Sequence, residues 1–211
     1  MPARLFLIRH GETQANIEQR YQGQGESHLS ELGLTESRKL ATFLSNEPFA
    51  AIYSSTLSRS YETARIIAKP HKLDVTRVPE LIERDYGAWE NMRFEEIKKK
   101  YADIYESWLI NPGKTRIPKA EPLEKLQKRA VTAIELLIKK HKGRTICIVG
   151  HGGLNRTILF HYLRIDLNAF WRIKQDNCCV NLIEYDHIPI VTLLNSTGFL
   201  GEKRIKGSGC Y

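Results

Sequence analysis

The sequence has no apolar run long enough to cross a membrane. Its longest runs, such as Leu5–Ile8 and Ile146–Val149, are far shorter than the roughly 20 residues that span a bilayer. The N-terminus also reaches charged residues and glycine too early for the apolar region of a signal peptide. These absences predict a cytoplasmic protein that has no membrane partner.

Cysteine is scarce and shows no recognisable spacing. The chain has four cysteines, Cys147, Cys178, Cys179 and Cys210, without a C-x-x-C pair among them. The H-E-x-x-H motif of zinc enzymes is missing as well. Without a secretion signal we expect reduced thiols, and these spacings predict no zinc site. The sequence therefore predicts neither a bound metal nor another cofactor.

The composition is otherwise that of an ordinary globular protein. Of 211 residues, 42% are hydrophobic and 27% charged, and the net charge is +8. Positive charge favours an anionic partner, but it does not choose between nucleic acid, an acidic membrane and phosphorylated small molecules. The basic residues are dispersed, and the short cluster Lys98–Lys100 is best interpreted as a solvated helix face. We therefore expect no nucleic-acid partner.

Short apolar runs alternate with amphipathic stretches along the chain. The runs that predict strands are Arg4–Ile8, Ala50–Tyr53, Leu73–Val78, Thr145–Val149, Val180–Tyr185 and Ile190–Leu194. Helices are predicted over Leu32–Leu44, Ser58–Ala68 with Ser58 as its N-cap, Arg93–Leu109, Leu123–Lys140 and a stretch from Gly153 to Leu163. This alternation predicts an α/β fold with a mostly parallel central sheet, helices on both faces and an antiparallel C-terminal edge.

Two predicted strands end in the same way. The first runs into Arg9-His10-Gly11, and the fourth runs into Gly150-His151-Gly152-Gly153. In open α/β sheets the ligand crevice lies beyond the carboxyl ends of the strands, so the two histidines are expected to face each other there. Arg9 adds a planar fork of donors suited to phosphate, and the glycines allow backbone N–H groups to approach an anion. Arg59 follows another strand end and would direct a second fork into this crevice.

Several blocks carry a family resemblance. They are Leu7–Thr13 with Asn16, Tyr53–Ala64 around Arg59, Leu81–Glu90, Val149–Arg156 and Asn195–Leu200. In this order the first four resemble the signature of the histidine phosphatase superfamily, the phosphoglycerate mutase-like proteins, and the last is similar to a pattern of its small phosphatases. The resemblance implies one histidine phosphatase domain over residues 1–211, with a small helical and loop insertion at about 90–122.

The resemblance also implies roles for individual residues. His10 would be the nucleophile that becomes phosphorylated, and Glu83 would donate a proton to the leaving oxygen. The phosphoryl group would be bound by Arg9, Arg59 and His151. Contacts to the substrate or its phosphate would come from Thr13, Asn16, Gln22, Gly23, Tyr86 and the backbone of Gly152. Because phosphoryl transfer needs positioning and positive charge around the oxygens, the two arginines and a protonated His151 would supply that charge without a metal.

The expected activity is hydrolysis of a small phosphorylated metabolite through phosphohistidine, as in α-ribazole phosphatase or metal-independent phosphoserine phosphatase. Two alternatives stay open. One is a 2,3-bisphosphoglycerate-dependent phosphoglycerate mutase, and the other is a catalytically silent module that binds a phosphorylated ligand or a protein. The short, proline-rich segment Asn111–Pro122 would be the main cover of the site, which favours hydrolysis. The substrate and the oligomeric state are not fixed by the sequence, and a homodimer is one option.

Overall fold

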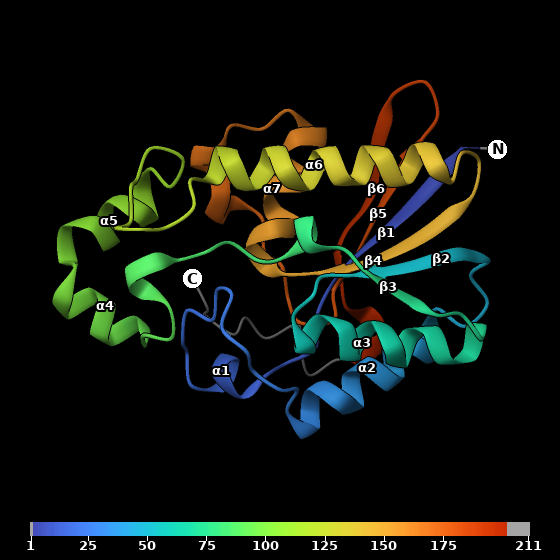
Figure 1. The fold of residues 1–211 in the computed structure, drawn as a ribbon, viewed down its shortest axis with the longest axis horizontal. Helices are drawn as coiled ribbons and strands as arrows, with labels where there is room; N and C mark the ends of the chain where they lie inside the picture. The colour runs from blue at the N-terminus through green and yellow to red at the C-terminus, as the bar shows by residue number, and fades with distance from the viewer. Residues whose placement is uncertain (1, 202–211) are drawn as a thin grey trace.

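The computed structural model describes residues 2–201 (Figure 1). Its sheet has six strands in the order β3-β2-β4-β1-β5-β6. The strands are β1 (Ala3–Arg9), β2 (Phe49–Ser54), β3 (Val75–Arg77), β4 (Thr145–Gly150), β5 (Val180–Tyr185) and β6 (Pro189–Ser196). The first four pair in parallel, whereas β5 pairs antiparallel with β1, and β6 antiparallel with β5. The predicted mostly parallel sheet with an antiparallel C-terminal edge is confirmed.

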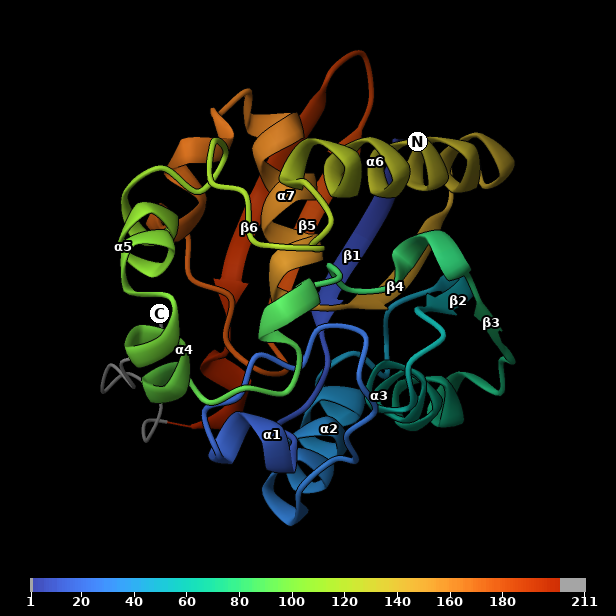
Figure 2. The same ribbon diagram turned by 60° about the vertical axis from the view of Figure 1, so that its left-hand side comes forward.

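Helices cover both faces of this sheet. They are α1 (Gln14–Ile17), α2 (Glu31–Phe43), α3 (Ser58–Ala68), α4 (Phe94–Lys100), α5 (Ala102–Ile110), α6 (Leu123–Lys140) and α7 (Gly152–Leu163). Helices α6 and α7 lie on one face, and α2 and α3 lie on the other (Figures 1 and 2). Helices α4 and α5 stand together beyond the edge of the α6–α7 layer (Figure 2).

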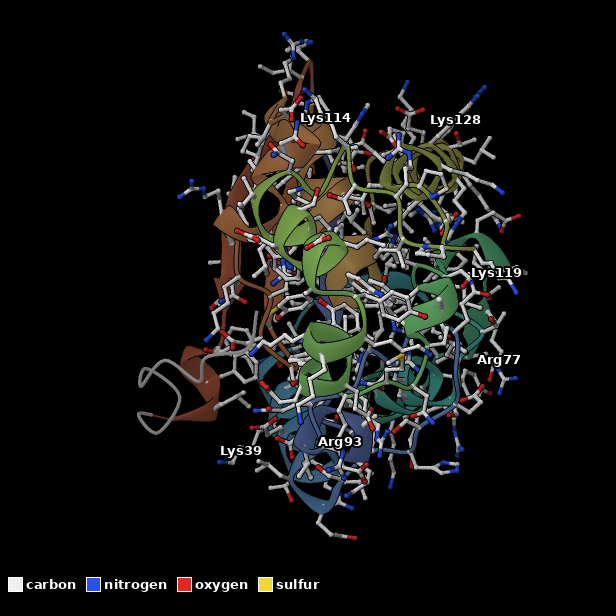
Figure 3. All side chains as sticks on the ribbon, turned by 90° about the vertical axis from the view of Figure 1, so that its left-hand side faces the viewer. Lys39, Arg77, Arg93, Lys114, Lys119 and Lys128 are labelled. Atoms are coloured by element: carbon white, nitrogen blue, oxygen red, sulfur yellow. The ribbon has the colours of Figure 1, made fainter. Side chains whose placement is uncertain are left out.

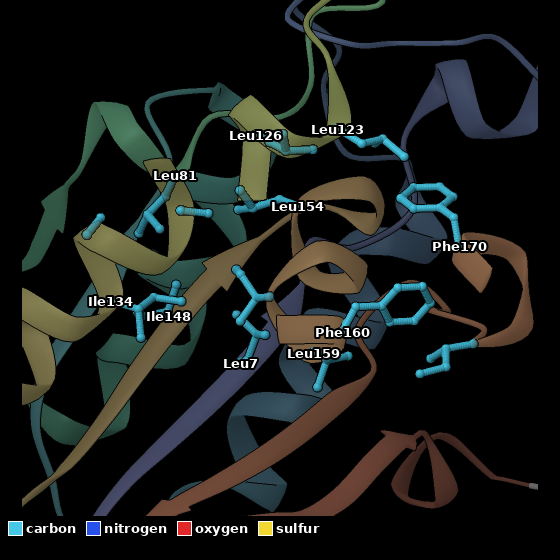
Figure 4. Packing of buried hydrophobic residues seen from close by; sticks show 14 of the residues in the cluster. Leu7, Leu81, Leu123, Leu126, Ile134, Ile148, Leu154, Leu159, Phe160 and Phe170 are labelled. Atoms are coloured by element: carbon cyan, nitrogen blue, oxygen red, sulfur yellow. The ribbon is translucent and has the colours of Figure 1, made fainter. Parts of the chain in front are cut away.

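The core has two parts, one on each face of the sheet. Because successive side chains of a strand point to opposite faces, Leu5 and Leu7 of β1 join the cluster under α6 and α7, while Phe6 and Ile8 join the cluster under α2 and α3. Figure 4 shows the first cluster, with the side chain of Leu7 beside residues of α7 and the strand β4. Two well-filled layers hold β1 and β4 rigidly, and the site is built at the ends of these strands.

Two details of the sequence-based prediction are wrong. The helix expected over Arg93–Leu109 is two helices, because Tyr101 leaves the helical conformation with φ −134° and ψ 42°. This break lets the second helix place Trp108 in the aromatic core, a tertiary contact that periodicity does not reveal. Ser58 is not the N-cap of α3: Leu57 holds that position, and the Ser58 hydroxyl donates to Glu26 instead.

Cys147, Cys178 and Cys179 are buried, while Cys210 lies outside the described residues. In the described part of the chain, no helix combines the length and the apolar character that crossing a bilayer requires. Six basic side chains are labelled in Figure 3: Lys39, Arg77, Arg93, Lys114, Lys119 and Lys128. They project from separate elements around the molecule, so these six do not form one basic stripe.

Candidate active site

A cavity of about 380 Å³ lies beyond the carboxyl ends of β1 and β4. This is the place where open α/β sheets bind their ligands. Of the residues expected in the site, the cavity wall includes Arg9, His10, Asn16, Gln22, Gly23, Arg59, Glu83, Tyr86 and Gly152. His151 and Thr13 are buried behind this wall. Segments that lie far apart in the sequence therefore meet around one cavity.

The two histidines lie side by side because their strands are neighbours. Arg9 of β1 pairs in register with Gly150 of β4, and the backbone N–H of His10 donates to the Gly150 carbonyl at 3.1 Å. The ring centroids of His10 and His151 are 5.2 Å apart, and both side chains are buried. One pair of parallel strands thus fixes the spacing of both rings.

The His10 ring is held in one orientation. Its Nδ1 lies 2.7 Å from the carbonyl oxygen of Gly11, so Nδ1 carries the proton and donates it, leaving the lone pair on Nε2. Burial, followed by the charges of Arg59 and Arg9, lowers the pKa of His10 well below its usual value. The ring is therefore neutral at neutral pH, which is the form in which an imidazole nitrogen can attack phosphorus.

His151 is neutral in the ligand-free site as well. Burial, then Arg59, His10 and Arg9, lowers its pKa well below the usual value, so the protonated form assumed from the sequence is disfavoured here. Its Nε2 lies 2.6 Å from Ser55 Oγ, while its buried Nδ1 has no hydrogen-bond partner among the described residues. A bound phosphate dianion would raise this pKa and give Nδ1 an acceptor.

Arg9 and Arg59 each donate hydrogen bonds to backbone carbonyls from one side of the guanidinium. On the other side, each has a buried nitrogen without a hydrogen-bond partner in the described chain. Arg9 Nη1 donates to the Gln175 carbonyl at 2.6 Å. Arg59 Nη1 and Nη2 donate to the carbonyls of Gly25 and Gly23, at 2.8 and 2.7 Å. The Nε atoms of Arg9 and Arg59 are buried without a partner in the described chain. Burial lowers the pKa of Arg59 to about 10, so it stays charged at neutral pH.

The loop that holds Arg59 is itself held by Glu90. This carboxylate accepts the backbone N–H groups of Tyr86 at 2.8 Å, Gln24 at 3.1 Å and Gly25 at 3.2 Å. Gly23 has φ +48°, and a Cβ atom at this position would overlap the Glu90 carboxylate. A glycine is therefore required at position 23 to bring its carbonyl to Arg59.

Glu83 comes to the cavity from the segment after β3. Its Oε1 accepts the N–H groups of Arg84 at 2.8 Å and Leu154 at 2.9 Å, and its Oε2 accepts that of Gly153 at 2.9 Å. Two N–H groups of the first turn of α7 are thus used by this carboxylate, although the sequence suggested that they face a bound anion. Glu83 and the histidines are linked rigidly through this helix start.

The remaining predicted residues differ in what they contact. Thr13 is the N-cap of α1, and its hydroxyl lies 3.0 Å from both Asn16 Oδ1 and Gln22 Oε1. The hydroxyl has one proton, so it donates to only one of these two amide oxygens at a time. Tyr86 is buried on the wall, and burial raises its pKa well above the usual range. Thr13 therefore acts as a support for two wall residues.

One segment of the cavity wall was not predicted from the sequence. It runs from Trp171 to Asn177, between α7 and β5, and includes Lys174, Gln175 and Asp176. The Asn177 side-chain amide donates to the His10 carbonyl at 3.1 Å, and the Gln175 carbonyl anchors Arg9. No local pattern marks these residues, because they reach the cavity through their position in an irregular loop. Arg156 also lines the cavity, although it was only noted as part of a motif.

Among the described residues, no group of three or more His, Cys, Asp and Glu side chains is arranged to hold a metal ion. The charged residues that line the cavity are four arginines, one lysine and three acidic residues, so positive charge is in excess. The arrangement is suited to bind an anion through N–H donors and to present one neutral imidazole to it.

The lowered histidine pKa values predict that the ligand-free protein loses stability in acid. The unfolded chain takes up protons on His10 and His151 near pH 6.5, roughly the pKa of a free histidine, whereas the folded site resists them. Below that pH the unfolded state binds more protons, so the free energy of unfolding falls, by up to about 1.4 kcal/mol per pH unit for each histidine. Thermal unfolding between pH 7 and pH 5 measures this slope.

The variant His151→Gln is the control for this prediction. It removes one of the two buried groups, so its melting temperature is expected to fall less steeply with acid than that of the wild type. Inorganic phosphate should also flatten the wild-type slope, because the bound anion raises both pKa values. Equal slopes for variant and wild type would contradict the assignment.

A mostly parallel sheet that brings two histidines and two arginines together at its strand ends defines a phosphoglycerate mutase-like α/β protein. The chain belongs to the histidine phosphatase superfamily, branch 1, whose family model matches residues 5–195.

Relatives and solved structures agree with this membership. Phosphoserine phosphatase 1 of Hydrogenobacter thermophilus is 36% identical over 200 residues, which cover 94% of this chain and 95% of that protein. The metal-independent phosphoserine phosphatase of Arabidopsis thaliana is 36% identical over 206 residues, or 93% of this chain and 85% of that protein. YhfR of Bacillus stearothermophilus superposes with a TM-score of 0.91 at 28% identity, covering 94% of this chain and all of that one.

Proposed function

We propose that the protein is a metal-independent phosphomonoesterase that hydrolyses a small phosphorylated metabolite through a phosphohistidine at His10. The observation that carries this proposal is the set of buried nitrogens without partners around His10: Nε of Arg9, Nε of Arg59 and Nδ1 of His151. Buried donors normally find an acceptor, and three of them at one cavity match the three oxygens of a transferring phosphoryl group.

The reaction has two steps at this site. Nε2 of His10 forms a bond to phosphorus while the bond from phosphorus to the leaving oxygen breaks, and Glu83 in its protonated form gives that oxygen a proton and becomes a carboxylate. Water then attacks phosphorus while the bond from phosphorus to Nε2 breaks, and the Glu83 carboxylate takes a proton from that water. Phosphate leaves, with His10 neutral and Glu83 protonated again. Arg9, Arg59 and His151 hold the phosphoryl oxygens throughout, which is the positioning and charge that phosphoryl transfer requires.

The segment Asn111–Pro122 was expected to be the main cover of the site, and this expectation is wrong, because none of its residues lines the cavity. The missing cover favours hydrolysis over mutase activity. The segment packs instead against the residues that follow Glu83. The Pro118 carbonyl accepts the N–H of Ala88 at 2.9 Å, and the Glu121 N–H donates to the Asp85 carbonyl at 2.9 Å. Closing a site is how enzymes keep water from a reactive intermediate. A site without this cover leaves phosphohistidine open to water, as hydrolysis needs.

Phosphate release in the presence of EDTA tests the proposed function. Purified protein treated with EDTA is expected to release phosphate from p-nitrophenyl phosphate and from a panel of small phosphomonoesters, because arginines supply the charge that a metal would. With 3-phosphoglycerate, release of phosphate should exceed formation of 2-phosphoglycerate, with or without added 2,3-bisphosphoglycerate.

Three results would contradict the proposal. Activity that EDTA removes and Mg²⁺ or Zn²⁺ restores would show metal-dependent chemistry. Isomerisation that depends on 2,3-bisphosphoglycerate and exceeds phosphate release by orders of magnitude would establish the mutase. A protein that binds phosphate but releases none from any substrate would be the silent module. The location in the cytoplasm, the homodimer and the single domain with an insertion at about 90–122 stay predictions.

A further inference from the structure

Arg156 lines the cavity but has no part in holding the phosphoryl group. It lies on α7 four residues after Gly152, and residues spaced by four share one face of a helix. Its Nε donates to the Ile173 carbonyl at 2.8 Å. The guanidinium carbon lies 5.2 Å from the ring centre of Phe170 and 5.0 Å from that of Trp171. The carbonyl and the two rings hold the fork in a fixed orientation.

Arg156 takes part in none of the ion pairs of the described chain. The charge of Glu83 acts on it without a direct ion pair. Burial, followed by the charge of Arg9, lowers its pKa to about 10, so it is still protonated at neutral pH. Its neighbour on the wall, Lys174, is already paired with Asp176 at 3.0 Å. A partly desolvated cation is costly unless an anion joins it.

We infer that Arg156 is a specificity-determining residue that binds a carboxylate on the leaving group of the substrate. Gly152 lies against Arg9, so Arg156 is placed one helical turn, about 5.4 Å, from the phosphoryl subsite. That spacing suits a phosphate and a carboxylate joined by a short carbon chain. One guanidinium fork matches one carboxylate, and the neighbouring cation Lys174 is already paired with Asp176.

This inference rests on the proposed function and narrows it to phosphomonoesters of small hydroxy acids. The matched substrates are O-phosphoserine and O-phosphoethanolamine, which differ only in the carboxylate. A second pair is 3-phosphoglycerate and glycerol 3-phosphate. The measured quantity is the ratio of kcat/KM between the members of each pair, for wild type and for Arg156→Met. Methionine keeps an apolar side chain against Phe170 and Trp171 but has no charge.

The wild type is expected to prefer the carboxylated member by about 10- to 100-fold, the effect of a charged hydrogen-bonded contact. In Arg156→Met that preference should fall to within about threefold, mainly through KM, because the contact is remote from the bond that breaks. Arg156→Lys keeps the charge without the fork and should retain part of the preference. The control Arg65→Met, at an exposed arginine of α3 outside the cavity, should keep all of it.

Two outcomes would overturn the role of Arg156. One is a wild type that uses both members of each pair equally, and the other is an Arg156 variant that loses both equally. Release of phosphate from p-nitrophenyl phosphate, which has no carboxylate, reports the phosphatase activity itself. If p-nitrophenyl phosphate is turned over but neither substrate pair shows a preference for the carboxylate, only the inference about Arg156 is wrong. If no substrate is turned over, the proposed function is wrong.

Discussion

The variant His10→Ala is expected to lose essentially all turnover, a fall on the order of 10⁶ as for other catalytic nucleophiles. His10 presents a lone pair on Nε2 because Nδ1 is bound to the Gly11 carbonyl at 2.7 Å. No other described group can replace it. Burial raises the pKa of the Cys179 thiol to about 12, so this thiol is protonated at neutral pH.

The phosphorylated intermediate gives a direct measurement. Wild-type protein quenched during turnover should carry phosphate that is labile in acid and stable in base, and His10→Ala should carry none. The control is His28→Ala, because His28 is an exposed histidine that does not line the cavity. If well-folded His10→Ala kept substantial turnover, or if the labelled phosphate were stable in acid, His10 would not be the nucleophile.

The sequence predicted the centre of this site because the pattern that marks it is local. A short apolar run that ends in His-Gly identifies both a buried strand and the residue just past its carboxyl end, and this holds at His10 and at His151. The helix over Leu123–Lys140 was predicted to the residue, since its apolar stripe is long and ends cleanly. Such signals do not depend on the rest of the fold.

The surroundings of the site could not be predicted in this way. Glu83 is bound by the first turn of α7, about seventy residues further along the chain. Arg9 is anchored by a carbonyl of the segment before β5, where any residue type supplies the same acceptor. The neutral state of His151 arises mainly from burial and from the charges of Arg59 and Arg9, both far from it in the sequence. These features follow from tertiary packing alone.

The variant Glu83→Gln separates a proton donor from a structural carboxylate. A proton donor matters for an alkoxide leaving group and little for p-nitrophenolate, which is stable without a proton. General acid catalysis contributes about 10²- to 10⁴-fold. We therefore expect kcat for an alkyl phosphate such as glycerol 3-phosphate to fall by that amount, and kcat for p-nitrophenyl phosphate to fall far less.

Glu83→Gln also weakens the hydrogen bonds that the carboxylate accepts from the backbone. The effect of this loss on the rates must be separated from the effect of losing the proton donor. The two oxygens of Glu83 accept three backbone N–H groups, from Arg84, Gly153 and Leu154. A glutamine offers one oxygen, which can take the place of Oε1, and its NH₂ then faces the N–H of Gly153. This mismatch disturbs the start of α7 whichever substrate is bound, so it lowers the rates of both by the same factor.

The control for that common factor is Glu90→Gln. Glu90 also accepts several backbone N–H groups, but it does not line the cavity. Its variant loosens the loop that holds Arg59 and should slow the alkyl and the nitrophenyl substrate equally. For each variant, the rate with the alkyl phosphate is divided by the rate with p-nitrophenyl phosphate. The difference between this ratio in Glu83→Gln and in Glu90→Gln measures the effect of losing the proton donor. If that ratio were the same in both variants, the carboxylate of Glu83 would be a support for α7 and the proton would come from another group.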